Sequence, residues 1–280
     1  MGRDPPSRSP DAPESEDMSE QTSWCNPVRA RLQAGQPVFG VTITTPSVEV
    51  AAHAATLGFH FLWVEMEHSP VTLETLRVIV LATRGLPAAV FARVPVNELW
   101  TAKRVLDQGV HGVIFPFTTT PEKAARAAAA SHYPPAGRRG SGAGAAMRTW
   151  PAADNYYDSA DREVFTLCVV EEAAAVEEID AIAATPGVDA LFIGTSDLSF
   201  SLGLRGRQDE PALEDAIRRI VDAAKRHGKF VGRPARTAEQ ARRYMEQGFL
   251  LFQSPTEVGL MEMGARQLLE GLDTGTRAMY

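Results

Sequence analysis

From Asn26 onward, short segments rich in Val, Ile, Phe and Leu alternate with longer segments rich in Ala, Leu, Glu and Arg. The short segments have the composition of buried strands, and the longer ones have the period of amphipathic helices. Strands are expected at 38–43, 61–65, 89–93, 112–117, 165–170, 190–194, 229–233 and 249–253. Helices are expected at 47–57, 73–83, 99–108, 122–131, 173–184, 211–226, 238–247 and 257–272. Because a helix follows every strand, the sequence predicts an α/β fold of the (β/α)8 TIM barrel type.

A doubly wound open sheet is the alternative fold for this alternation of strands and helices. That fold binds a dinucleotide or a phosphate through glycines that follow the first strand. Here the first expected strand is followed by Thr44-Thr45-Pro46-Ser47, which contains no glycine. The sequence therefore favours the closed barrel.

The 280 residues divide near residue 24. Residues 1–24 are rich in Pro, Ser and acidic residues and offer little to bury, so we expect a disordered leader. Met18 lies inside this leader and is a second candidate for the first residue of the chain. Residues 25–280 have about the ~250 residues of one α/β barrel, so we expect a single barrel domain there.

Charge and hydropathy exclude several classes of partner. The net charge of −7 and the pI near 5.5 would repel a phosphate backbone, so no nucleic-acid partner is expected. Apolar runs are shorter than the ~18 residues that a membrane span needs, and no apolar signal core stands at the N-terminus. The two cysteines, Cys25 and Cys168, form neither a disulfide framework nor a zinc site. We therefore expect a cytoplasmic protein without a membrane partner.

Polar residues stand where the expected strands end. The active site of such a barrel lies at the carboxyl ends of its strands, so these residues are the candidates for chemistry. They are Glu65, Glu67, His68, Arg93, Glu171, Asp197, Arg233 and Gln253. Acids, a histidine and arginines are thus predicted to meet at one rim of the barrel.

Glu171 and Asp197 follow neighbouring strands and are the candidate metal ligands. Two carboxylates can hold a hard divalent cation and leave positions open for water and for substrate oxygens. The alternative for each residue is an ion pair with an arginine or a helix cap. Their place on one rim favours the metal site.

His68, Glu65 and Arg93 are the candidate catalytic residues. His68 can act as a general base or acid near neutral pH, with Glu65 orienting its imidazole. Arg93 leaves an apolar strand at the same rim, where it can stabilise a developing oxyanion. The alternative for Arg93 is an ion pair with Glu65 or Glu67.

Lysine placement restricts the chemistry of the site. Of the 28 basic residues only four are lysines: Lys103, Lys123, Lys225 and Lys229. None of them ends an expected strand at the reactive rim, whereas a Schiff-base aldolase or a pyridoxal phosphate enzyme needs a buried lysine there. Carbonyl chemistry in this barrel must therefore rely on a metal and on Arg93.

A glycine-rich segment runs from Tyr133 to Gly144. A phosphate-binding loop is one interpretation, but no strand precedes this segment and no Gly-Lys-Ser/Thr ends it. We interpret it instead as the start of a long loop that reaches about Arg162 and could act as a lid.

Ordered motifs along residues 26–270 resemble the HpcH/HpaI family of metal-dependent, class II pyruvate aldolases. The motifs are Asn26-Pro27, Gly35-Gln36-Pro37-Val38-Phe39-Gly40, Glu67-His68, Arg93-Val94-Pro95, Tyr133-Pro134-Pro135, Arg139-Gly140, Glu171 and Phe192-Ile193-Gly194-Thr195-Ser196-Asp197-Leu198-Ser199. The last motif is the most specific. The resemblance implies a (β/α)8 barrel that binds Mg²⁺, Mn²⁺ or Co²⁺. It also implies a homo-oligomer, usually a hexamer, whose last helix exchanges between subunits.

The resemblance also implies roles for single residues. Glu171 and Asp197 are similar to the metal ligands of the family, and Arg93 is similar to the residue on the pyruvyl oxygen. His68 with Glu65 resembles a histidine and carboxylate dyad. The backbone of Gly194, Thr195 and Ser196, up to Asp197, resembles the cradle for the pyruvate carboxylate.

Three positions differ from the family pattern. The carboxylate of the dyad is commonly Asp, and here it is Glu65, which is one methylene longer. Val169 stands two residues before the metal glutamate, where a glutamine is usual. Thr195 replaces a frequent proline after the Ile-Gly pair.

The resemblance implies reversible retro-aldol cleavage of a 4-hydroxy-2-oxo acid to pyruvate and an aldehyde that the sequence does not identify. Arg148 and Arg233 are candidate partners for a distal carboxylate of that substrate. One alternative is a related lyase or decarboxylase that acts on oxaloacetate or an acyl-thioester through the same enolate. Another is a non-catalytic barrel that binds a 2-oxo acid.

Overall fold

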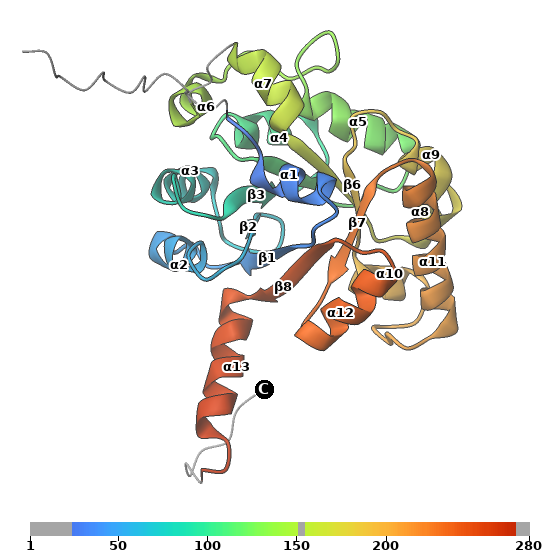
Figure 1. Ribbon diagram of the computed structural model, residues 1–280. Helices are drawn as coiled ribbons and strands as arrows, with labels where there is room; N and C mark the ends of the chain where they lie inside the picture. Colours follow the sequence, from blue (N-terminus) through green and yellow to red (C-terminus); the bar gives the residue numbers. More distant parts are fainter. Residues whose placement is uncertain (1–23, 151–154, 273–280) are drawn as a thin grey trace, which may run out of the picture.

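The computed structural model describes residues 24–150 and 155–272 (Figure 1). Eight parallel strands form a closed barrel in chain order, and β8 pairs with β1. The strands are β1 (Val38–Ile43), β2 (Phe61–Glu65), β3 (Ala89–Arg93), β4 (Gly112–Phe115), β5 (Phe165–Val170), β6 (Ala190–Ile193), β7 (Phe230–Pro234) and β8 (Leu251–Thr256). The (β/α)8 barrel predicted from the sequence is therefore confirmed.

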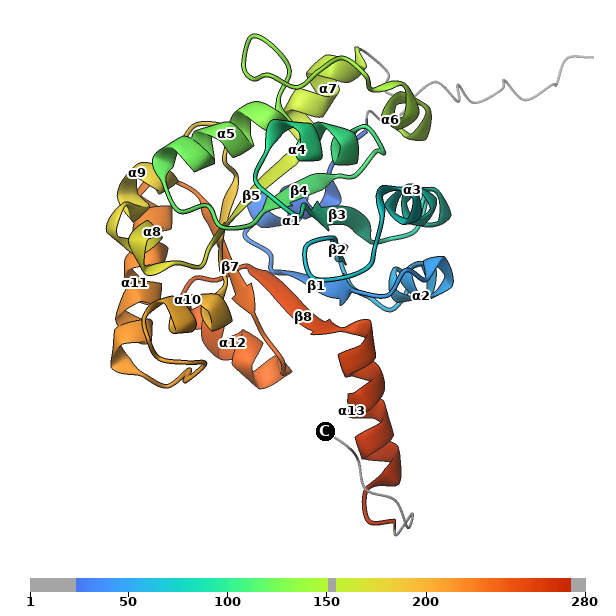
Figure 2. The ribbon, with the colours of Figure 1, turned by 180° about the vertical axis from the view of Figure 1, so that it is seen from behind.

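Helices surround the barrel on its outer side (Figures 1 and 2). They are α1 (Pro27–Gln33), α2 (Val48–Ala54), α3 (Leu73–Ala82), α4 (Leu99–Leu106), α5 (Pro121–Ser131), α6 (Gly144–Thr149), α7 (Tyr156–Glu163), α8 (Ala173–Glu177), α9 (Ile179–Ala183), α10 (Thr195–Ser201), α11 (Pro211–Arg226), α12 (Ala238–Glu246) and α13 (Glu257–Leu269). The expected helix at 173–184 is two short helices that meet at Glu178, whose φ of −105° and ψ of 14° interrupt the helix. The sequence did not predict α1, α6, α7 and α10.

The core has two layers, one inside the barrel and one between the strands and the helices. Alternate strand residues, such as Phe61, Trp63 and Phe91, fill the barrel interior. The residues between them, such as Leu62 and Val64, pack under the helices. Because both faces of each strand are buried, the strands appear in the sequence as continuous apolar runs. At Gly40 a Cβ would lie 2.2 Å from the Phe61 ring, so only glycine fits against this large interior side chain.

The amino end of the barrel is closed by α1 and by the segment that precedes β5. The Asn26 side chain caps α1 and donates to the carbonyl oxygens of His111 and Glu163. Trp24 stacks on Trp150 with 6.0 Å between the ring centroids. The long loop after α5 thus packs at the end opposite to the reactive rim, with α6 and α7 inside it (Figure 1). Its interpretation as a lid over the active site is therefore wrong.

The predicted disordered leader falls almost entirely on residues 1–23, which lie outside the described residues. Its last residue, Trp24, is 7% exposed and packs with the barrel, so the packed part of the chain begins one residue earlier than expected. The division into a leader and one barrel domain stays a prediction. Among the described helices, none has both the length and the apolar character needed to cross a membrane.

The last helix, α13, points away from the barrel (Figures 1 and 2). No residue of α13 is buried within the described chain, although the helix carries large apolar side chains. Met261 is 68% exposed and Leu268 is 78% exposed. Only the first turn of α13 packs on its own barrel, through Leu260, and apolar side chains left exposed beyond it are unusual for a soluble monomer.

Burial of His111 at the amino end of the barrel lowers the pKa of its imidazole to about 4, because the charged form would lose its hydration. The unfolded chain takes up this proton near pH 6.5, and the folded chain does not do so until about pH 4. The free energy of unfolding should therefore fall by ~3 kcal/mol from this group as the pH drops through that window.

Urea unfolding of His111→Gln and of the wild type between pH 7 and pH 4 tests this prediction. The variant should be less stable at pH 7 but should lose less stability on acidification. His53→Gln, at an exposed histidine of α2, is the control and should follow the wild type. Parallel pH curves for His111→Gln and the wild type would contradict the prediction.

Candidate active site

The candidate residues meet at the carboxyl ends of β2, β3, β5 and β6. Glu65 and Arg93 are the last residues of β2 and β3, and Glu171 directly follows β5. Asp197 lies in the first turn of α10, after β6. Arg93, Glu171 and Asp197 line one cavity of about 1030 Å³ that opens at this rim. The structure thus brings the predicted site residues together at the carboxyl end of the barrel.

The Glu65 carboxylate is buried and accepts hydrogen bonds from four donors. Arg93 Nε donates to Oε2 over 2.6 Å, and the Trp63 indole donates to the same oxygen over 3.3 Å. The backbone N–H groups of Glu67 and His68 donate to Oε1 over 2.7 Å and 3.0 Å. The Ser69 hydroxyl donates to the Glu65 carbonyl oxygen. Glu65 therefore fixes the loop that follows β2 and one edge of the Arg93 guanidinium.

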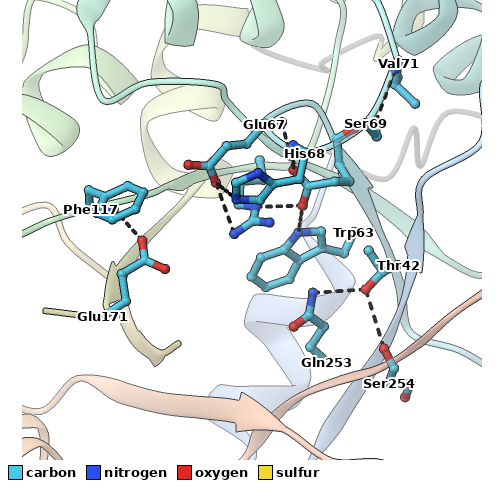
Figure 3. A network of polar contacts seen from close by, with 12 residues as sticks. Thr42, Trp63, Glu67, His68, Ser69, Val71, Phe117, Glu171, Gln253 and Ser254 are labelled. Atoms are coloured by element: carbon cyan, nitrogen blue, oxygen red, sulfur yellow. Dashed lines mark hydrogen bonds and ion pairs between the residues drawn. The ribbon is translucent and has the colours of Figure 1, made fainter. Parts of the chain in front are cut away.

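Glu67, and not Glu65, stands beside the His68 ring (Figure 3). Glu67 Oε2 lies 3.6 Å from His68 Nε2 and 3.1 Å from Arg93 Nη1. Glu65 reaches only the backbone N–H of His68, so its expected contact with the imidazole does not exist in this structure. The reason is geometric, because the turn after β2 folds the His68 backbone over the Glu65 carboxylate and turns the ring toward Glu67.

Burial raises the pKa of the Glu67 carboxyl, and the charges of Glu65 and Asp197 raise it further, while Arg93 and His68 oppose this. Glu67 Oε2 is buried and accepts no hydrogen bond of good geometry from the described residues. The sequence placed Glu67 at the rim as an ion-pair partner of Arg93 and as part of the Glu67-His68 motif, and it assigned Glu67 no catalytic role. Its position directly before His68 in the sequence was the signal that Glu67 could contact the His68 ring.

Arg93 forms both of the ion pairs that the sequence offered as the alternative to a catalytic role. Its side chain is 14% exposed, and its guanidinium lies 5.8 Å from the centre of the Trp63 ring. The two carboxylates hold Nε and Nη1, while the guanidinium also lines the cavity. The ion pairs therefore position this cation at the cavity wall and are compatible with an anion in front of it.

Glu171 is held from the other side of the rim (Figure 3). Its Oε1 accepts the backbone N–H of Phe117 over 2.6 Å, and Phe117 adopts a left-handed φ of 47°. Burial raises the pKa of the Glu171 carboxyl to about 7, the Phe117 N–H and Arg93 lower it, and Glu67 and Asp197 raise it. At Gly194 a Cβ would lie 2.8 Å from Glu171 Oε2, so this glycine leaves room for the carboxylate.

The residues of the expected substrate cradle lie where β6 meets the first turn of α10. Gly194, Thr195 and Ser196 line the cavity together with Asp197. Thr195 is buried, whereas Ser196 and Asp197 are exposed. The first N–H groups of a helix have no partner within that helix, so those of this turn can donate to a ligand. The structure thus brings all of these residues to the same cavity as Glu171 and Arg93.

The donor set of this site suits a hard cation with water in its coordination shell. Within the described residues there is no group of three or more His, Cys, Asp and Glu side chains placed as a complete metal site. Glu171 Oε2 and the exposed Asp197 are free to coordinate, and Glu67 Oε2 adds a third charge nearby. Mg²⁺ and similar ions are commonly held by one or two carboxylates and keep several waters. Two ligands and an excess of negative charge therefore fit such an ion.

Two lysines lie nearer to the cavity than the sequence predicted. Lys123 Nζ donates to the Phe117 carbonyl oxygen over 3.0 Å, and Lys225 lines the outer part of the cavity. Lys123 is half-buried and Lys225 is exposed. Neither has the buried, desolvated amine that a Schiff base requires.

The fold and the site together define a (β/α)8 barrel with a carboxylate-lined mouth. The family model for HpcH/HpaI aldolase/citrate lyase matches residues 41–261. The chain belongs to this family.

Named relatives cover nearly the whole barrel. A hydroxypyruvate/pyruvate aldolase of Paraburkholderia phytofirmans is 33% identical over 255 residues, which is 89% of this chain and 98% of the relative. A 5-keto-4-deoxy-D-glucarate aldolase of Salmonella arizonae is 33% identical over 245 residues, or 88% and 96% of the two chains. The crystal structure of a family protein from Burkholderia cenocepacia has a TM-score of 0.81 at 34% identity, covering 88% of this chain and 98% of the other. The resemblance drawn from the motifs is confirmed.

Removal of the Glu65 carboxylate should destabilise the barrel strongly. Glu65→Ala leaves the Arg93 cation short of a partner in a site that is nearly closed to water. We expect a loss of about 3 kcal/mol or more in the free energy of unfolding, measured in urea.

The control is Glu98→Ala. Glu98 pairs with Arg126 over 2.7 Å, but the two side chains are 43% and 47% exposed. Loss of this pair should cost less than about 1 kcal/mol. Equal losses in the two variants would show that Glu65 has no special structural role.

Proposed function

We propose that this protein is a carbon–carbon lyase that cleaves a 4-hydroxy-2-oxo acid to pyruvate and an aldehyde with the help of a divalent cation. The observation that carries the proposal is the placement of Arg93, His68 and three carboxylates, those of Glu67, Glu171 and Asp197, at one barrel rim. The aldolase names of the relatives support the same reaction.

Glu171 and Asp197 would hold the cation, which we expect to be Mg²⁺, Mn²⁺ or Co²⁺. When bound, this ion would act as a Lewis acid on the 2-oxo group. Phe117 contributes by fixing one oxygen of Glu171, so that the other oxygen faces the cavity. The backbone N–H groups of Thr195 and Ser196 would receive the carboxylate of the 2-oxo acid beside Gly194, whose own N–H donates to the Val170 carbonyl oxygen.

Arg93 would stabilise the negative charge that develops on the C2 oxygen. Its guanidinium is already fixed by Glu65 and Glu67, so little reorganisation is needed when the charge appears. The carboxylates of Glu65 and Glu67 also compensate the guanidinium of Arg93 for its loss of hydration. Glu65 therefore acts in the reaction through Arg93.

His68 would take the proton of the C4 hydroxyl, with Glu67 stabilising the imidazolium that forms. The C4 oxygen then forms the aldehyde carbonyl as the C3–C4 bond breaks. The electron pair of that bond forms the second bond between C2 and C3, and the π pair of the C2 carbonyl moves onto its oxygen, which gives the enolate of pyruvate. A proton added at C3 completes pyruvate.

We also propose that the protein is a homo-oligomer, and that it is a hexamer with an exchanged last helix as the family resemblance implies. The exposed apolar side chains of α13 support this proposal, since burial against a second subunit would remove them from water. Sedimentation velocity of the full chain measures its subunit number. The cytoplasmic location stays a prediction.

Removal of the cation should abolish cleavage. We expect EDTA to stop pyruvate release from 4-hydroxy-2-oxo acids, and added Mg²⁺, Mn²⁺ or Co²⁺ to restore it. Glu171→Gln should need a higher metal concentration for half-maximal activity, because a neutral amide is a weaker ligand for a hard cation. Activity that survives the chelator, together with a borohydride-trapped adduct, would overturn the metal mechanism.

His68→Asn should lower the turnover number for aldol cleavage by ~10²–10⁴, the usual contribution of a general base. Oxaloacetate has no C4 hydroxyl, and its decarboxylation forms the same enolate. Any decarboxylation by the wild type should therefore be retained in the variant, with CO₂ and pyruvate as the measured products. His53→Asn, at an exposed position of α2, is the control and should match the wild type. Unchanged aldol cleavage in His68→Asn would rule out this role.

A further inference from the structure

Two polar side chains, one on β8 and one on β1, point into the barrel and take no part in the proposed reaction. Leu251 belongs to the interior layer of the core and Phe252 to the layer under the helices, so the alternation of β8 turns Gln253 inward. On β1, Val41 lies under the helices, so its neighbour Thr42 also faces inward. Gln253 lines the active-site cavity. Polar groups in such a place are costly unless they meet partners.

Gln253 and Thr42 are hydrogen-bonded to each other (Figure 3). Gln253 Nε2 donates to Thr42 Oγ1 over 3.0 Å, and Thr42 Oγ1 donates to the Ser254 carbonyl oxygen over 3.5 Å. Because Ser254 takes the single hydroxyl proton of Thr42, this hydroxyl can only accept from Gln253, which orients the amide. Figure 3 shows the amide nitrogen turned toward Thr42 and the amide oxygen turned away from it.

A bulge in the barrel wall brings these groups together. Gly40 pairs with Gln253 and Thr42 pairs with Thr256, so β8 has one residue more than β1 between the two pairs. Bulges of this kind occur next to active sites, where they redirect a side chain. Here the bulge begins directly after Gln253 and places the Ser254 carbonyl oxygen within reach of the buried Thr42 hydroxyl.

The amide oxygen of Gln253 is the free end of this pair. Among the described residues no donor reaches Gln253 Oε1, and the half-buried side chain lies against the cavity. An amide oxygen is a neutral acceptor with two lone pairs. It can receive the O–H of a ligand, but a carboxylate or a phosphate has no proton to give it near neutral pH. Gln253 therefore suits an uncharged hydroxyl group.

The order of the strands around the barrel determines which part of the substrate meets Gln253. Glu171 and Asp197 follow β5 and β6, and Arg93 ends β3, so the 2-oxo acid end of the substrate lies on that side. In the proposed reaction His68, which follows β2, takes the proton of the C4 hydroxyl. In the closed barrel β1 is the next strand after β2 and lies opposite β5, and β8 is its other neighbour. The substrate carbon beyond C4 therefore points toward Gln253.

We propose that Gln253 is a specificity-determining residue that accepts a hydrogen bond from a hydroxyl group at C5 of the substrate. Thr42 is the positioning residue that orients the Gln253 amide for this contact. The inference rests on the proposed aldol cleavage and names the class of aldehyde for that reaction. The preferred product is an aldehyde with a hydroxyl group on the carbon next to its carbonyl.

The test compares 4,5-dihydroxy-2-oxopentanoate with 4-hydroxy-2-oxopentanoate, which have the same carbon chain and the same charge. Pyruvate release in saturating Mg²⁺ gives kcat/KM for each substrate, and the ratio of the two values is the readout. Because a 5-hydroxyl group also changes the intrinsic reactivity at C4, the comparison is between the ratios of the wild type and its variants. Gln253→Met keeps the length of the side chain and removes the amide. It should lower the ratio roughly 3- to 10-fold, the effect of one neutral hydrogen bond, through the dihydroxy substrate alone.

Variants of Thr42 separate orientation from contact. Thr42→Val should also lower the ratio, by a smaller factor, because the Gln253 amide loses the acceptor that orients it. Thr42→Ser keeps the hydroxyl and should keep the ratio of the wild type. Gln33→Met is the matched control, because Gln33 is an exposed glutamine of α1 that does not line the cavity. It should equal the wild type on both substrates.

An unchanged ratio in folded Gln253→Met would overturn the inference. An equal loss on both substrates, with an unchanged thermal unfolding midpoint, would also overturn it. If Gln253→Met does not fold, Thr42→Val decides, and a ratio equal to that of the wild type would count against the inference. Metal-dependent cleavage of the monohydroxy substrate would in each case leave the proposed aldolase function standing. No pyruvate release from either substrate, with or without metal, would overturn the proposed function and the inference with it.

Discussion

The buried Glu65 carboxylate is the interaction on which the geometry of the site depends. It accepts from Arg93, from the Trp63 indole and from the two backbone N–H groups that begin the next loop. One acid thereby joins β2, β3 and the loop that presents Glu67 and His68. These four donors compensate the loss of hydration of a carboxylate that is 2% exposed. The role of Glu65 in this structure is therefore to hold Arg93 and the loop after β2 in place.

The rim holds more negative than positive charge. Glu67, Glu171 and Asp197 share the space in front of Arg93, and burial together with mutual repulsion raises the pKa of both Glu67 and Glu171. Such a cluster is costly to assemble, and a bound divalent cation would relieve it. The strain is thus a physical reason for expecting metal affinity from residues that do not by themselves complete a coordination shell.

The sequence predicted the strands well and the amino end of the barrel poorly. β1, β2, β3 and β5 have the expected bounds, because strands buried on both faces leave continuous runs of Val, Ile and Phe. Helices α6 and α7 are only six and eight residues long, and α6 begins in the glycine-rich segment where propensity indicates a loop. They are helical because residues such as Ala146, Tyr156 and Ala160 are buried against the barrel. Tertiary packing, and not local propensity, therefore makes this segment helical.

The sequence also predicted one part of the candidate site and missed another. Strand ends placed Arg93, Glu171 and Asp197 at one rim, since parallel strands of a barrel all end on the same side. The partner of His68 was not predictable, because Glu65 and Glu67 are two residues apart and only the path of the turn decides which acid meets the ring. The positions of the strand ends in the sequence therefore predict which residues reach the rim. The backbone geometry of the loop after β2 determines which acid contacts the His68 ring.

The elements around the cavity differ in how much of their sequence is buried. The mouth of the barrel is built on β2, β3, β5 and β6, whose residues are almost all buried. The cavity is also bordered by α12, which buries only Ala241. Substitutions on the exposed face of α12 therefore cost little core packing, whereas substitutions at the strand ends disturb the buried network around Glu65. The groups at the strand ends can thus stay fixed while the lining contributed by α12 changes.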